Sequence, residues 1–146
     1  MQISAEKENN FWQQVRKNSL SLLSLMVALS ALSYNTWRNE ATERNRNIRA
    51  AEFEMLRHLI DVQQIIDQTH LRKDGQNLNQ GLNRVLLISD LARLTPAPVQ
   101  QSAEKLRADW VQHADKLADQ REAMANLSEQ VWHTRQAVLA SLRSLK

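Results

Sequence analysis

The feature that most constrains this chain is a stretch without charged residues, NSLSLLSLMVALSALSYNTW, from Asn18 to Trp37. As an α-helix, the segment from Trp12 to Trp37 would be about 37 Å long, which suits a hydrocarbon core of about 30 Å with its interfaces. Aromatic side chains favour those interfaces, and Phe11 precedes the stretch while Tyr34 lies near its end. The pattern predicts a single membrane-spanning helix over residues 18–37.

Two other interpretations of this stretch remain open. A cleaved signal peptide would also have a basic lead-in, here Arg16 and Lys17, and small residues at cleavable offsets, such as Ala28 and Ala31. The long lead-in, which contains Glu8, and the aromatic residues on both sides favour an anchor. A core helix of a folded domain is the third interpretation, because several serines make the stretch only moderately apolar.

Small and polar residues recur within the stretch at spacings of three and four. Such spacing places them on one face of a helix, and in lipid small residues let two helices approach closely. The face therefore indicates self-association, although serine and alanine are also common in weakly apolar anchors. Its members are Ser21, Ser24, Ala28, Ala31 and Asn35.

The rest of the chain predicts an all-α fold. The whole sequence has two glycines, two prolines and no cysteine, and no β-type alternating run occurs. We expect a polar tail at residues 1–17, the anchor at 18–37, and an antiparallel helical bundle at 38–146. The net charge is only +3, and acidic and basic residues alternate, so no concentrated basic surface indicates binding to nucleic acid.

Beyond the anchor, we expect the first helix to continue to about residue 72. Apolar residues at spacings of three and four form one stripe, and a second stripe beside it indicates packing on more than one partner. We predict that Gly75 ends this helix, that a second helix covers 76–94, and that Thr95 caps the next helix with Pro96 in its first turn. The first stripe is Ile48, Ala51, Met55, Leu59, Val62 and Ile66, and the second is Phe53, Leu56 and Ile60.

Residues 99–146 contain an apolar seven-residue repeat typical of a coiled coil or a helical bundle. The segment has neither glycine nor proline, which predicts one long third helix. Such a helix would extend beyond the other two and leave its apolar seam uncovered, so we expect a homo-oligomer. The alternative is a break near residues 119–126 that closes a four-helix bundle. The repeat consists of Ala103, Trp110, Leu117, Met124, Val131, Val138 and Leu145.

Four histidines are the only candidates for chemistry that the sequence offers. Each follows a carboxylate by about one helical turn, a spacing that suits a metal ligand, an oriented imidazole or an ordinary surface pair. No glycine-rich phosphate loop, metalloprotease motif or nucleophile elbow occurs. We therefore predict no catalytic, cofactor-binding or metal-binding residue and no enzymatic activity. The pairs are Glu54 with His58, Asp67 with His70, Asp109 with His113, and Glu129 with His133.

These patterns predict a single-pass protein of the cell membrane whose bundle binds partners, either further copies of itself or another membrane protein. The alternative is a ligand-sensing bundle that signals through a separate partner. Arg16 and Lys17 directly precede the anchor, whereas only Arg38 directly follows it. Because positive charge is enriched on the cytoplasmic side, we expect the bundle outside the cytoplasm.

Overall fold

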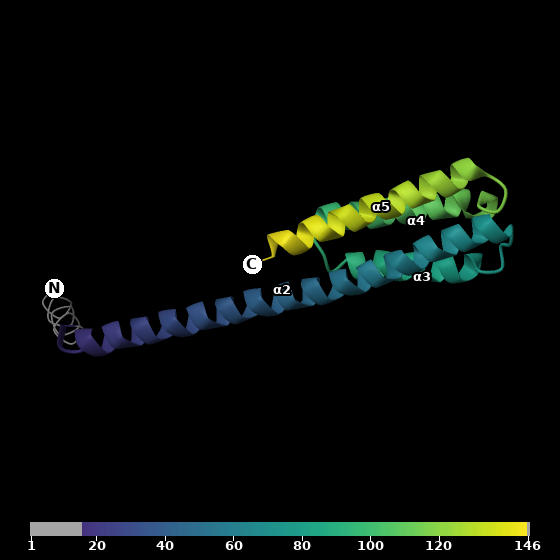
Figure 1. Cartoon of the computed structure of the whole chain (residues 1–146). Helices are drawn as coiled ribbons and strands as arrows, with labels where there is room; N and C mark the ends of the chain where they lie inside the picture. Colours follow the sequence, from purple (N-terminus) through teal and green to yellow (C-terminus); the bar gives the residue numbers. More distant parts are fainter. Residues whose placement is uncertain (1–15, 146) are drawn as a thin grey trace, which may run out of the picture. The chain divides into compact units, whose positions relative to one another are not determined.

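A computed structural model of the chain describes residues 16–145 (Figure 1). This part is helical and contains no strand, which confirms the predicted all-α class. Four α-helices and one short 3-10 helix follow one another. They are α2 at Ser19–Arg72, α3 at Leu78–Ala92, α4 at Ala97–His113, η1 at Ala114–Lys116 and α5 at Arg121–Ser144.

The chain divides into two compact units, one up to Glu43 and one from Arg44 onward. In the first unit, α2 has an 18-residue segment with a mean hydropathy of 1.3, and none of this segment is buried. It is long and apolar enough to cross a membrane, and it is not a core helix of this structure. Residues 1–15 of the predicted tail, which include Phe11 and Trp12, lie outside the described residues.

The second unit is a helical bundle with one core. Its buried side chains come from the C-terminal part of α2 and from α3, α4 and α5. Two hydrogen bonds between α2 and α5 show their relative direction. The amide of Gln63 donates to Ser128, and the earlier residue Arg49 donates to the carbonyl of the later residue Leu145. These two helices are therefore antiparallel. The first predicted stripe of α2 is confirmed as the buried face, with Ile48, Ala51, Met55, Leu59, Val62 and Ile66 all inside.

The predicted single third helix is wrong. The chain turns at residues 114–120, slightly before the alternative break that we expected near 119–126, and α5 packs back against α4. The turn needs no glycine because its residues have negative φ: a 3-10 turn is followed by Gln120 in an extended conformation. Leu117 is wholly buried, and its carbonyl oxygen lies 3.0 Å from Nδ1 of His70. Burial of Leu117 thus stabilises a chain reversal for which the sequence has no glycine or proline signal.

Two predicted helix ends also need correction. The left-handed residue after α2 is Lys73, with φ of 55°, and not Gly75, whose φ is negative. The amide of Asp74 bonds the carbonyl of Thr69 at 3.3 Å, which is the bond of a Schellman C-cap. At the start of α4 the N-cap is Pro96, while the Thr95 hydroxyl donates backwards to the carbonyl of Ala92. The predicted Thr95 cap is wrong.

Gly81 has a packing role that propensity alone does not indicate. It is buried in α3, and a β-carbon at this position would collide with the ring of Trp110 from α4 and approach Ile65 of α2. The absence of a side chain lets three helices meet around a large indole. Gly81 therefore weakens α3 locally but permits the dense core at this level.

Candidate docking groove between helices α2 and α5

A line of apolar side chains on α2 remains uncovered in the bundle. Phe53 is 56% exposed, Ile60 is 58% exposed and Leu71 is 80% exposed. Phe53 and Ile60 are 7 residues apart, and Ile60 and Leu71 are 11 residues apart. The total of 18 residues is five turns of an α-helix, so the three side chains lie along one side of α2. We call this set the α2 line. It contains two members of the second stripe predicted from sequence, and the third member, Leu56, is partly buried against the core.

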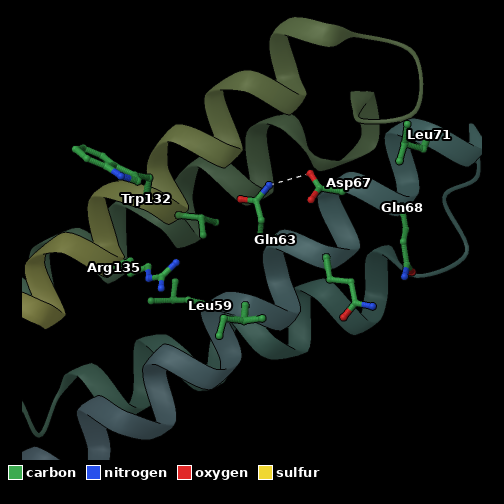
Figure 2. A pocket seen from close by; sticks show the side chains of 10 residues that line it. Leu59, Gln63, Asp67, Gln68, Leu71, Trp132 and Arg135 are labelled. Atoms are coloured by element: carbon green, nitrogen blue, oxygen red, sulfur yellow. Dashed lines mark hydrogen bonds between the residues drawn. The ribbon is translucent and has the colours of Figure 1, made fainter.

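Beside the α2 line, α2 and α5 form a groove of about 460 Å³ (Figure 2). Its floor is the edge of the core, and Trp132 of α5, which is 55% exposed, forms part of its wall. This volume is within the range of small-molecule sites, and the groove is partly open to solvent. The lining residues are Leu59, Ile60, Gln63, Gln64, Asp67, Gln68, Leu71, Val131, Trp132 and Arg135.

Polar groups connect the two walls of the groove. The amide of Gln63 donates to Asp67 at 2.9 Å, as Figure 2 shows, and to the hydroxyl of Ser128 on α5 at 3.0 Å. Asp67 is thus already engaged within the chain. Arg135, on the opposite wall, makes no hydrogen bond or ion pair with any described residue. The groove therefore presents apolar surface, amide groups and one available cation.

A second, polar groove of about 300 Å³ separates α4 from α5. It brings together two of the four predicted histidines, His113 and His133, with Asp109, Glu129 and Lys105. Nε2 of His133 lies 3.5 Å from Glu129, as the spacing predicted, and both side chains are at least half exposed. No contact joins Asp109 to His113 among the described interactions.

The other two histidines serve contacts between helices. His58 lies 4.0 Å from Glu54, its predicted neighbour, and also 3.6 Å from Asp61 and 3.4 Å from Arg84 of α3. His70 does not pair with Asp67 and instead contacts the turn before α5 through the carbonyl of Leu117. Within residues 16–145, no three histidine, aspartate or glutamate side chains converge in a way that could hold a metal ion.

Comparisons with known proteins do not add to this description. No protein-family model matches the sequence, and neither a curated protein nor a solved structure matches it. The candidate site must therefore be interpreted from its own geometry.

Sequence reasoning located one wall of the groove and missed the other. The second stripe of α2 indicated that this helix would face more than one partner. Trp132 and Arg135 were not singled out as site residues, because their position opposite α2 depends on the turn at 114–120. The only sign of this wall in the sequence is the spacing of Trp132 and Arg135, which are three residues apart and so lie on one face of a helix.

Proposed function

We propose that this chain is a single-pass membrane-anchored interaction protein without catalytic activity of its own, whose α2–α5 face binds a second copy of the same chain. The observation that carries the proposal is the α2 line. Three large apolar side chains along one helix, flanked by an exposed tryptophan, form the kind of surface that marks a protein contact in soluble domains.

The geometry of the α2 line suits a symmetric pair. Phe53 and Leu71 are about 27 Å apart along the helix axis. Two identical copies in the same membrane can form a pair with two-fold symmetry. A two-fold axis parallel to the line would then bring Phe53 to Phe53, Ile60 to Ile60 and Leu71 to Leu71, which is the isologous contact that closes a dimer.

The charges of α2 do not oppose this pairing. On this helix the arginine nearest to Ile60 in sequence is Arg57, and its guanidinium lies 3.1 Å from Glu54 of the same helix. Two such neutralised pairs could meet across the axis without strong repulsion. Membrane anchoring also raises the effective concentration of the two surfaces, so a modest contact area is sufficient.

Sedimentation of the full chain in mild detergent tests the proposal. We expect the wild-type chain to form dimers, and the double variant Phe53→Ser/Ile60→Ser to sediment as a monomer with unchanged helix content. The matched control is Leu94→Ser/Val111→Ser, which removes exposed apolar side chains from outside α2 and α5. Dimers that persist in the first variant, or are lost equally in the control, would contradict the proposal.

We place the bundle outside the cytoplasm, on the basis of Arg16 and Lys17 before the anchor. Protease treatment of intact spheroplasts should then digest the bundle. Protection until lysis would reverse the orientation and would change which membrane partners are accessible to it.

The groove itself supports a second candidate function, a ligand-sensing bundle that signals through a separate partner. Its volume, the indole of Trp132 and the unpaired Arg135 suit an organic anion with a flat apolar body. A thermal-shift screen with benzoate, and with benzyl alcohol as the uncharged control, separates the two functions. A saturable shift with benzoate that Arg135→Gln abolishes would favour sensing, and no shift would favour the protein contact alone.

A further inference from the structure

One ionisable side chain lies inside the bundle with no opposite charge beside it. Glu52 of α2 is 0% exposed and, within residues 16–145, it is the only acidic or basic residue that is buried. It lies on the buried stripe of α2, between Ala51 and Met55. An ionised carboxylate in such a position costs several kcal/mol of solvation unless it is paired, so its environment decides its state.

Among residues 16–145, the environment of Glu52 offers a hydroxyl but no cation that pairs with it. Neither carboxylate oxygen makes a hydrogen bond of regular geometry, and the same is true of the buried Ser141 hydroxyl of α5. Burial raises the pKa of Glu52 above its ordinary value of 4.5, and the nearby Ser141 hydroxyl opposes this effect only in part. The two groups thus face each other across the α2–α5 contact as an incompletely satisfied pair.

The charged residues on the surrounding elements point elsewhere. On α2, Arg49 donates to the carbonyl of Leu145 at 3.4 Å. On α5, Arg143 is exposed, and at the C-terminal end of α3 the exposed Asp90 and the following Arg93 lie 3.9 Å from each other. The first turn of α4, residues 97–100, contains no charge. None of these groups pairs with Glu52.

We propose that Glu52 and Ser141 form a proton-operated latch that holds the end of α5 on α2. The neutral carboxyl remains inside, beside the Ser141 hydroxyl, so the latch is closed. When the carboxyl releases its proton to solvent, the carboxylate needs water, and the end of α5 separates from α2 to admit it. Ser141 is only three residues from the end of α5 at Ser144, and helix ends open at low cost.

A distance measurement on the full chain in lipid nanodiscs tests the latch. The protein has no cysteine, so spin labels can be placed at Ala50→Cys and Ser144→Cys, both exposed. We expect one short distance at pH 4.5 and a growing population of longer distances as the pH rises. Between the pKa values of the open and closed forms, the ratio of open to closed chains should increase by about tenfold per pH unit.

Three variants make the test specific. Glu52→Gln should stay closed at every pH, while the matched control Glu54→Gln, two residues away on the exposed surface, should respond as the wild type does. Ser141→Ala should move the transition to lower pH, because the closed form loses the hydroxyl that partners the buried carboxyl and therefore opens more easily. A wild-type distance that is independent of pH, an unchanged response in Glu52→Gln, or no displacement in Ser141→Ala would overturn the latch.

Discussion

Leu59 and Ile60 are neighbours in α2 and nearly identical in size, yet Leu59 is 1% exposed and Ile60 is 58% exposed. The contrast recurs nearer the N-terminus of α2, where Met55 is buried and Phe53 is exposed. The helix therefore has two apolar faces, and the bundle covers only one. The buried face explains why the chain folds, and the exposed face requires a different explanation, for which we propose contact with a second copy.

The largest expected effect separates these two faces directly. Leu59→Ala should lower the free energy of unfolding by about 2–5 kcal/mol, because it leaves a cavity in a closed core. Ile60→Ala should change it by no more than about 0.5 kcal/mol in the monomer. Urea unfolding of each full-length variant, followed by circular dichroism in detergent at a concentration that favours monomers, measures both values. Equal losses would mean that the two faces are equally covered.

A second prediction concerns a place where the covered side of the bundle is especially tight. Gly81→Ala would improve helix propensity by about 1 kcal/mol in an open helix. Here the added methyl group meets the Trp110 ring, and we expect a net loss of about 1–3 kcal/mol from overpacking. The same unfolding measurement applies, with Gly75→Ala, in an exposed turn, as the control that changes little. Stabilisation by Gly81→Ala would show that the core around Trp110 is loose.

The smallest expected effect is on the pH dependence of stability, and it compares a buried carboxyl group with an exposed one. Because burial raises the pKa of Glu52, the folded chain binds more protons than the unfolded chain above pH 4.5, and stability falls as the pH rises through this window. The slope should not exceed about 1.4 kcal/mol per pH unit. Glu52→Gln should remove this dependence, so that the variant is the more stable protein at neutral pH.

Glu104 is the matched exposed carboxylate. A hydrogen bond from Arg107 lowers the pKa of Glu104. Its contribution to stability is therefore present at pH values above the ordinary pKa of glutamate and is lost as the pH falls. Solvent screens this surface pair, and Glu104→Gln should leave the pH profile of unfolding almost unchanged. If Glu104→Gln changed the pH profile of unfolding more than Glu52→Gln does, the raised pKa assigned to Glu52 would be contradicted.

Periodicity was sufficient to predict the all-α class and the buried stripe of α2, because burial imposes the 3.6-residue period directly on the sequence. It also predicted the interior positions of Leu117, Val131 and Val138. It could not predict the turn at 114–120, where a buried Leu117 and an extended Gln120 reverse the chain without glycine or proline.

That one missed turn had consequences for the site. With α5 folded back, the seam of residues 124–145 is covered within the chain, and it no longer requires another subunit. The expectation of a homo-oligomer therefore loses its original reason and now depends on the α2 line. The partnership of Trp132 and Arg135 with α2 could not be derived either, since it arises only when a long-range contact places α5 beside α2.

Cross-linking between single cysteines in membranes tests most directly whether a second copy covers the α2 line. The full-length chain in membrane vesicles, with Ile60→Cys, should form a disulfide dimer quickly on mild oxidation. Val111→Cys, exposed on α4, and Val131→Cys, buried within the chain, should stay monomeric. Equal cross-linking at Val111 and Ile60, or no cross-linking at Ile60, would contradict the account.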